Sequence, residues 1–351
     1  MFFEKNEMRD DSSEQLKDNE CQLPDGDSDI VNQPPQDSDS ADYVELIGDH
    51  YVIKKPDGSY PIAARLPQIA AYQKEEDSRH REDISADTSD FGQYRVYASS
   101  IRGTGKRSRI RPGVRQDSFA VCCAGEKWII GVVADGVSAS SKSHLLADYM
   151  AQYMAKRLSQ LLAECNDIES VDWNSESRMA EEAAYIYCRD YCEQHRLSGS
   201  YLDYFATTLE CIIVGIDGAN DGAYAYFSIT GDGDCYVFND KGLIKALKSQ
   251  EDHENQTDRA HSEAVVALPK DPGDPFIRYG TLNDGEYLLL TTDGYAKIGN
   301  EKMKIGEFLF DRLSKVNGII SYLQAMDFLA FQNDDDRTGI MIGRNWNVDR
   351  S

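Results

Sequence analysis

The residues of this sequence that could do chemistry are five aspartates, each at the start or end of an expected β-strand or between two strands. They are Asp117, Asp135, Asp232, Asp293 and Asp335. If the strand ends converge, each close pair of carboxylates repels by about 4 kcal/mol at roughly 4 Å with an effective dielectric of about 20. Nothing basic lies within these turns, so the group needs cations. Ligands that are all oxygen favour Mg²⁺ or Mn²⁺ over zinc or copper.

Asp135 shows the pattern most clearly. It follows the apolar run 128–134, which is rich in β-branched residues and has the length of a buried strand, and it precedes Gly136. The carboxylate and the main-chain carbonyl at such a turn can both offer oxygen to a hard cation. An ordinary strand-to-helix turn with a solvated aspartate has the same sequence. The repeat of the pattern at Asp293 and Gly294 favours the metal site.

A loop rich in cations, residues 106–115, leads directly into Asp117. It stands out because the protein as a whole is acidic. Two interpretations are open for it: a solvated loop that balances neighbouring carboxylates, or an arm that binds phosphate beside a metal site. The arginines of this loop are Arg107, Arg109, Arg111 and Arg115.

The elements that position these residues are mostly short strands that follow one another closely, which indicates an antiparallel meander and not βαβ units. The expected strands are 94–98, 116–121, 128–135, 207–215, 223–229, 235–238, 286–294 and 337–343. Apolar residues at helical spacing over 145–161 predict one helix, and 174–197 and 304–331 contain three more. The polar stretch 249–275 predicts a mobile flap near a site.

Composition divides the chain into parts. Residues 1–41 are acidic and polar and bury almost nothing, which predicts disorder. Residues 42–75 are expected to form a small β-hairpin-like appendage, and 76–93 a charged linker. One large domain is expected over 94–345, followed by a tail at 346–351.

With 351 residues and 41% hydrophobic content, the chain can bury a substantial core. Its formal net charge of -24 argues against nucleic acid or an anionic membrane as a main partner, because both need a basic surface. No apolar run approaches the roughly 20 residues that span a bilayer, and the start of the chain lacks a signal-peptide core. We therefore expect a cytoplasmic protein without a membrane partner.

The eight cysteines are scattered through apolar contexts and predict reduced core residues, not a disulfide framework. Cys188, Cys192 and His195 lie at helical spacing and could bind a metal, but three possible ligands on one helix face are a weak signal, and a packed helix explains the spacing better. None of the cysteines has an arginine six positions later, so a cysteine-nucleophile phosphatase is excluded.

Six short motifs follow one another in an order that resembles the metal-dependent protein serine/threonine phosphatases of the type 2C family, in a bacterial-style form. They are Gln116-Asp117-Ser118, Val133-Ala134-Asp135-Gly136, Thr207-Thr208, Gly231-Asp232, Thr292-Asp293-Gly294 and Asp335-Asp336-Arg337-Thr338. Each motif alone is a weak signal, and the order makes the set specific. The resemblance spans residues 94–345. It implies an α+β fold, a four-layer α-β-β-α sandwich of two antiparallel sheets flanked by helices.

The resemblance also implies a centre of two Mn²⁺ or Mg²⁺ ions at one edge of the sandwich. Asp135 would bridge both ions, and the carbonyl of Gly136 would bind one of them. Asp293 and Asp335 would complete one metal site, and Asp117 would act mainly through bound water. These are expectations for five positions of this chain that match the family's motifs.

A third, looser ion is implied at Asp232, which matches an aspartate of the bacterial members. The loop around it departs from the family pattern. Residues 231–234 are Gly-Asp-Gly-Asp, whereas the family has Gly-Asp-Ser-Arg, so the arginine is missing. Val137 stands where other members have a histidine, so no residue is assigned as general acid.

The phosphate-binding arginine of the family would stand five residues before Asp117, where this chain has Pro112. Arg111 and Arg109 become the first candidates to bind the phosphate, and Arg107 and Arg115 are the remaining ones. A guanidinium from this loop would hold phosphate oxygens through paired hydrogen bonds.

The activity implied is hydrolysis of phosphoserine and phosphothreonine in proteins, by direct attack of a metal-bridging water or hydroxide. The partner would be a phosphorylated protein, together with the serine/threonine kinase that modifies it. The alternative is a catalytically weak or inactive module that acts in phosphoprotein binding or scaffolding, because several secondary positions depart from the family pattern.

Overall fold

The computed structural model of the protein describes residues 82–107, 113–248, 266–270, 272–295, 305–330 and 335–344, together with three strands nearer the N-terminus. The remaining residues lie outside the described part of the chain. Predictions that fall there concern the acidic region 1–41, most of the flap 249–275, the tail 346–351, and the two arginines Arg109 and Arg111.

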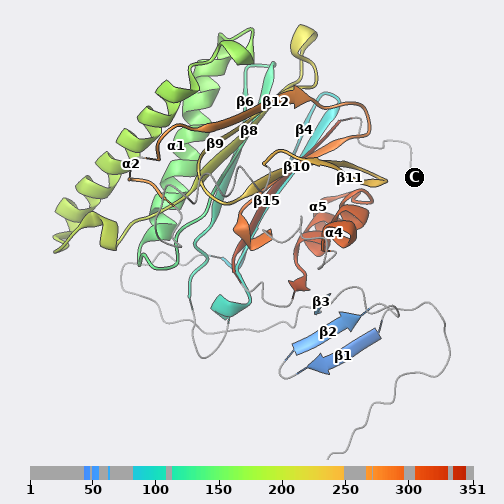
Figure 1. Ribbon diagram of the computed structural model, residues 1–351, viewed down its shortest axis with the longest axis horizontal. Coiled ribbons are helices and arrows are strands. Elements are labelled where there is room, and N and C mark those ends of the chain that lie inside the picture. Colours follow the sequence, from blue (N-terminus) through green and yellow to red (C-terminus); the bar gives the residue numbers. More distant parts are fainter. Residues whose placement is uncertain are drawn as a thin grey trace, which may run out of the picture. The chain divides into compact units, whose positions relative to one another are not determined.

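Two antiparallel sheets form the centre of the molecule (Figure 1). The first has six strands, in the order β11 (Gly242–Ala246), β10 (Asp234–Asn239), β13 (Tyr287–Thr291), β15 (Arg337–Arg344), β5 (Tyr94–Ile101) and β4 (Ile84–Phe91). The second has five, in the order β12 (Phe276–Thr281), β9 (Ala223–Thr230), β8 (Leu209–Gly215), β7 (Trp128–Ala134) and β6 (Ser118–Ala124). The successive strands β6, β7, β8 and β9 are neighbours in one sheet and form the expected antiparallel meander, whereas the chain passes to the other sheet between β5 and β6 and between β9 and β10.

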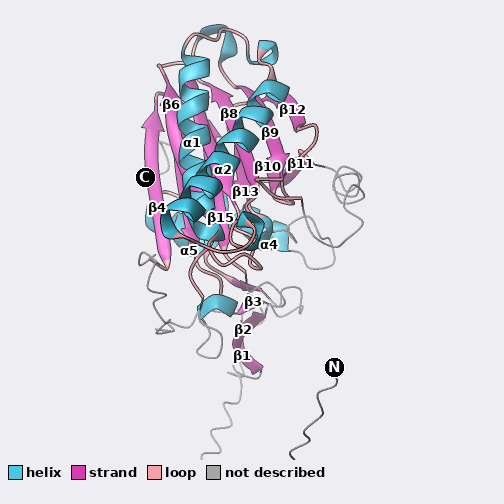
Figure 2. Cartoon of the chain, turned by 90° about the vertical axis from the view of Figure 1, so that its left-hand side faces the viewer, coloured by secondary structure: helices cyan, strands magenta, loops and turns pink. Residues whose placement is uncertain are grey.

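Helices cover the two outer faces. The long helices α1 (Ser143–Ala163) and α2 (Trp173–His195) lie over the five-stranded sheet, and Figure 2 shows them in front of its strands. The shorter α4 (Ile305–Leu313) and α5 (Ile319–Met326) lie on the other side, by the six-stranded sheet. Short 3-10 turns connect several elements: η1 (Gly105–Arg107), η2 (Ile168–Ser170), η3 (Tyr201–Asp203), η4 (Gly218–Asn220) and η5 (Asp293–Tyr295).

Strand β7 shows why its sequence is continuously apolar. Trp128, Ile130 and Val132 belong to the core beneath α1 and α2, whereas Ile129 and Val133 belong to the core between the two sheets. Because successive side chains of a strand point to opposite faces, a strand buried on both faces needs an apolar residue at every position.

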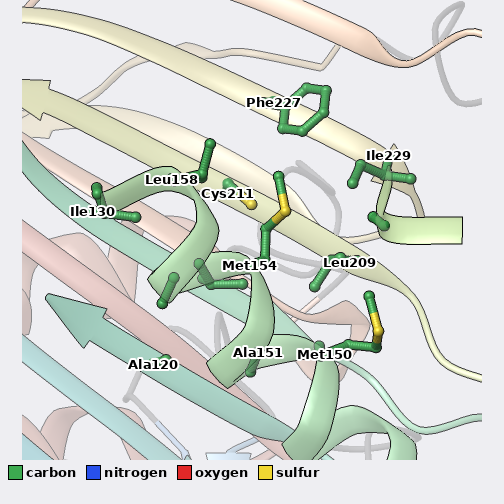
Figure 3. Close-up of a cluster of buried hydrophobic side chains, with 14 of the residues drawn as sticks. Ala120, Ile130, Met150, Ala151, Met154, Leu158, Leu209, Cys211, Phe227 and Ile229 are labelled. Atoms are coloured by element: carbon green, nitrogen blue, oxygen red, sulfur yellow. The ribbon is translucent and has the colours of Figure 1, made fainter. Parts of the chain in front are cut away.

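Three hydrophobic cores thus separate four layers. One lies between the sheets, one under α1 and α2, and one under α4 and α5. Figure 3 shows the second, where Met154 and Leu158 of α1 pack over Cys211 and Phe227 of the sheet. The predicted α+β fold, a four-layer α-β-β-α sandwich, is confirmed.

Part of the expected linker 76–93 is in fact strand β4, which pairs with β5 along its whole length. The sequence of β4 is polar because the strand lies at the edge of its sheet and three of its residues in succession, 86–88, are exposed. Strands β11 and β12 were not predicted either. Both are edge strands with little buried surface, so their sequences lack the apolar pattern that signals a strand.

Within residues 42–75, β1 (Tyr43–Ile47) pairs with β2 (His50–Lys54), and β2 pairs with β3 (Ile62–Ala63). The short strand β14 (Leu329–Ala330) pairs in turn with β3. These strands make a separate small sheet in the order β1-β2-β3-β14. No described helix of the protein is long and apolar enough to cross a membrane.

Candidate active site

The strand register brings the predicted aspartates together in pairs. Ser118 lies opposite Ala134, so Asp117, just before β6, and Asp135, just after β7, are neighbours across the ladder. Likewise Thr291 of β13 lies opposite Gly339 of β15, and the hydrogen bond from the Thr292 N–H to the Thr338 carbonyl, 3.0 Å, extends this pairing toward Asp293 and Asp335. One pair comes from each sheet, and both lie at strand ends.

Two glycines let the segments of these pairs approach closely. A Cβ atom on Gly136 would lie 2.7 Å from the carbonyl oxygen of Gln116, the residue before Asp117. A Cβ atom on Gly294 would lie 1.8 Å from the carbonyl oxygen of Asp336, the residue after Asp335. Real Cβ contacts are never so short, so each glycine is required by the backbone beside it. The Asp-Gly pattern therefore reflects packing between the aspartate-bearing segments.

Asp135 is held by two threonines at the entrance to β8. Its carbonyl oxygen accepts hydrogen bonds from the Thr208 N–H and the Thr207 hydroxyl, both 2.8 Å. Its own N–H donates to the Thr208 hydroxyl, 3.0 Å. The backbone on which the Asp135 carboxylate stands is thus fixed on both sides, and the two threonines serve its position.

Three carboxylates of the site perturb one another. Burial, and then the nearby Asp117 and Asp293, raise the pKa of Asp135 well above its usual range. Burial, and then Asp336, raise the pKa of Asp117 to about 7, and burial, and then Asp232, raise the pKa of Asp293 to about 6. The carboxyls of Asp135 and Asp293 also share a hydrogen bond. The centre therefore holds more negative charge than its own basic groups neutralise.

The donor set fits a hard divalent cation. All donors are oxygens, and the buried Oδ1 atom of Asp293 finds no hydrogen-bond partner among the described residues. Such an oxygen is costly to leave unpaired, and a cation would satisfy it. Within the described residues, however, no three His, Cys, Asp or Glu side chains are already gathered at metal-binding geometry. This applies also to Cys188, Cys192 and His195, where His195 instead stacks on Tyr191 with ring centroids 4.1 Å apart.

Lys106, in η1, brings a positive charge into the centre. Its Nζ atom lies 2.7 Å from Asp335 Oδ1 and 2.7 Å from Asp336 Oδ2. Burial by itself lowers the pKa of Lys106, but Asp336, Asp335 and Asp117 raise it by more, and the balance is upward. The turns that carry the aspartates contain no basic residue, and η1, at the start of the basic loop, supplies one.

Asp336 organises the backbone around the site. Its side chain is fully buried, with no exposed area, and it accepts hydrogen bonds from the N–H groups of Gly103 at 2.7 Å and Gln116 at 2.5 Å. Together with Lys106, these bonds join the segments before β6 and before β15. Nearby, the Thr292 hydroxyl donates to Asp117 Oδ2 at 2.8 Å and so fixes the orientation of that carboxylate.

The family model for protein phosphatase 2C matches residues 104–334, which include four of the five aspartates. The chain belongs to the protein phosphatase 2C family. Comparison with curated protein sequences gives no match.

Several solved structures are similar to this 2C-family chain at low sequence identity. Serine/threonine phosphatase Stp1 from Staphylococcus aureus is 15% identical, with 76% of this chain and 98% of that chain covered and a TM-score of 0.44. PppA of Pseudomonas aeruginosa is 14% identical, with 72% and 99% covered and a TM-score of 0.45. The catalytic domain of PstP, solved in complex with two manganese ions, is 18% identical, with 71% and 97% covered and a TM-score of 0.45.

The arginines of the basic loop in this 2C-family chain divide into two groups. Arg109 and Arg111, the first candidates for the phosphate, lie outside the described residues. Arg107 is buried and lies 4.0 Å from Asp83 and 3.9 Å from Asp327. Arg115 is also buried and donates to the carbonyl of Asp117, 2.8 Å. Arg107 and Arg115 therefore have structural partners.

The roles of three members of the site, Lys106, Thr292 and Asp336, were not predicted. Each lies in a predicted motif or in the basic loop, but nothing in the local sequence distinguishes its role. Lys106 belonged to a run of cations, and Asp336 to the run of aspartates before β15. Their roles arise from contacts between segments about 230 residues apart.

Proposed function

We propose that this chain is an Mn²⁺- or Mg²⁺-dependent protein serine/threonine phosphatase. The observation that carries the proposal is that Asp117 and Asp135 are neighbours across the strand ladder and that Asp117 and Asp293 both raise the pKa of Asp135, while Oδ1 of Asp293 has no hydrogen-bond partner among the described residues. Membership of the protein phosphatase 2C family supports the same reaction class.

In this proposal Asp135 and the Gly136 carbonyl hold the cations together with Asp293 and Asp335. Asp117, oriented by Thr292, accepts hydrogen bonds from the water around them. Asp232 contributes to a third and weaker ion. When bound, the cations supply Lewis-acid activation of water and neutralise charge on the phosphoryl group. A set of two ions, with a third held loosely, is the expected stoichiometry.

The phosphate is bound by the segment between η1 and β6. We assign this role to Arg111 and Arg109, because a guanidinium can hold two phosphate oxygens at once. Lys106 adds a second positive charge beside the same centre while it holds Asp335 and Asp336. The substrate is a phosphorylated serine or threonine in a protein, supplied by a cognate kinase, and the reaction takes place in the cytoplasm.

Hydrolysis of a phosphothreonine peptide by the full chain, with Mn²⁺ and with EDTA, tests the proposal. We expect Mn²⁺-dependent turnover that falls by at least about a hundredfold in Asp135→Asn and in Asp293→Asn, because each change replaces a charged carboxylate ligand by a neutral amide. The matched control is Asp311→Asn, which alters an exposed carboxylate on α4. Turnover that needs no divalent cation, or that survives both substitutions, would contradict the proposal.

A second measurement addresses the phosphate. Arg109→Ala and Arg111→Ala should raise KM or lower kcat/KM without loss of bound Mn²⁺. Unchanged kinetics in both variants would instead make the basic loop a solvated segment.

A second candidate function is phosphoprotein binding without turnover. The observation that favours it is the ion pair of Lys106 with Asp335 and Asp336. Asp335 is an expected metal ligand, and here its carboxylate is already paired with an ammonium group. In that case the chain would bind the phosphothreonine peptide, measured by fluorescence anisotropy, and release no phosphate at any Mn²⁺ concentration. Turnover in the first assay rejects this alternative.

A further inference from the structure

A buried ion pair lies under the loop that carries Asp232. The side chain of Lys248 has no exposed area, and its Nζ atom lies 2.9 Å from Oε1 of Glu210, which is 2% exposed. Glu210 is on β8, in the five-stranded sheet, and Lys248 follows β11, in the six-stranded sheet. The ion pair therefore joins the two sheets from within.

The polar groups of this pair are satisfied by their surroundings. Glu210 Oε2 accepts a hydrogen bond from the Tyr226 hydroxyl at 3.0 Å, and Ser228 lies 3.2 Å from both Glu210 Oε1 and Lys248 Nζ. Charges are rarely kept in a protein interior unless they are paired and hydrogen-bonded as these are. A buried pair is weak evidence for stability, since apolar residues of similar volume often stabilise as well.

The remaining hydrogen bonds of Lys248 go to the loop between β9 and β10. Nζ donates to the carbonyl oxygens of Gly231, 2.9 Å, and Gly233, 3.2 Å. These two carbonyls flank Asp232. The loop crosses from one sheet to the other at this point. The Lys248 ammonium, paired with Glu210, therefore binds the loop backbone on both sides of Asp232.

The two glycines let the loop pack directly against Glu210 and Thr291. A Cβ atom on Gly231 would lie 2.9 Å from Glu210 Oε1, and one on Gly233 would lie 2.4 Å from the Thr291 carbonyl and 2.7 Å from Glu210 Oε2. Gly231 also has a φ of 142°, which other residues rarely adopt. The Asp232 carboxylate acts on Asp293, whose pKa it raises. The ion pair thus holds the backbone on both sides of Asp232, and the carboxylate of Asp232 acts on the acidic centre.

We propose that the Lys248–Glu210 pair positions Asp232 and thereby sets the affinity of the site for the divalent cation that Asp232 helps to hold. The inference rests on the proposed function. Hard cations need oxygen ligands at narrowly defined distances, so a ligand on a loosened loop binds more weakly because the loop must be ordered again on binding. Lys248 and Glu210 act through Asp232 and are positioning residues.

The experiment measures Mn²⁺ binding to the full chain, after removal of metal with EDTA, by isothermal titration calorimetry and by the signal of free Mn²⁺ in electron paramagnetic resonance. The main variant is Lys248→Met with Glu210→Gln, which removes both charges and leaves a side chain that still accepts from Tyr226. The single variant Lys248→Met leaves Glu210 buried without its partner and serves as the second, more severe test.

We expect the tighter Mn²⁺ ions to bind as in the parent, and the Kd of the weakest ion to rise by about tenfold or more. Asp232→Asn should give the same loss. On the Asp232→Asn background, the paired change should add less than about twofold, because the pair acts only through Asp232. The matched control is Arg157→Met, which breaks the 2.8 Å ion pair of Arg157 with Glu176 and should leave every Mn²⁺ affinity unchanged.

The outcomes separate this inference from the proposed function. Parent-like binding of every ion by the folded paired variant, or a further loss of affinity on the Asp232→Asn background, would overturn the inference alone. A parent chain that binds no Mn²⁺ would contradict the proposed function and this inference with it. Melting temperatures in EDTA identify any variant that is not folded, and a parent-like value for the paired variant excludes a merely structural effect.

Discussion

Asp117 is a carboxylic acid whose ionisation in the folded protein is opposed by its surroundings. Burial, and then Asp336, raise its pKa to about 7, from an ordinary value of 3.8. The folded pKa lies above the unfolded one, so the folded state binds more protons between these values. The contribution of Asp117 to stability is then complete below about pH 4 and is lost as the pH rises through about 7.

This predicts the pH dependence of the protein in EDTA. The free energy of unfolding of the parent, measured by urea titration between pH 5 and 7, should fall relative to that of Asp117→Asn by about 1.4 kcal/mol per pH unit. Saturating Mn²⁺ should reduce this fall, because a cation stabilises the ionised form. Asp311→Asn, at an exposed carboxylate, is the control. Parallel curves for the parent and Asp117→Asn would contradict the prediction.

At the level of single residues, sequence reasoning selected the aspartates but not their neighbours. Asp135 and Asp293 were recognisable because an apolar strand followed by Asp-Gly is a local pattern. The partnership of Lys106 with Asp336 is not local, and which cation of a basic run reaches the carboxylates depends on how η1 packs. The buried pair of Glu210 and Lys248 escaped detection for the same reason.

The elements that carry the aspartates are held by close backbone contacts, and Gly294 makes the closest of them. We predict that Gly294→Ala lowers the free energy of unfolding by about 3 kcal/mol or more, because its Cβ would meet the carbonyl of Asp336. The control is Gly318→Ala, where nothing lies within 4 Å of the added atom and φ is an extended -178°. It should cost less than about 1 kcal/mol. Equal stability of the two variants in urea would refute this reason for the glycine.

Among the elements, those buried on two faces were predictable and the edge strands were not. Strand β7 is apolar throughout because it borders two cores, whereas β4 and β12 each expose much of their length to solvent. A strand at an edge gains hydrogen bonds from its single neighbour without needing an apolar sequence. Strand β4 forms because it pairs with β5, and β12 because it pairs with β9. The residues of these two edge strands carry little sequence pattern that predicts a strand.

For the whole molecule, the members of the three hydrophobic cores among the residues whose burial is described run from 84 to 342. We therefore predict that a chain without residues 1–81 folds and keeps its melting temperature within about 3 °C of the full chain, since about 1 kcal/mol corresponds to a few degrees at this size. Differential scanning calorimetry of both chains measures this. A chain that begins at residue 94 is the informative comparison, because it lacks β4 and should be clearly less stable. Aggregation of the 82–351 chain would show that the N-terminal strands are needed for folding.

The interlocked turns also bear on how such a protein can change over generations. Gly136 lies against Gln116 and Gly294 against Asp336, so each pair of aspartates shares one backbone contact. Insertion or deletion of a residue in one of these segments would displace the segment beside it as well. We therefore expect the arrangement of the aspartates to change little as the sequence diverges. New substrate specificity is more readily gained in segments that make neither of these two glycine contacts.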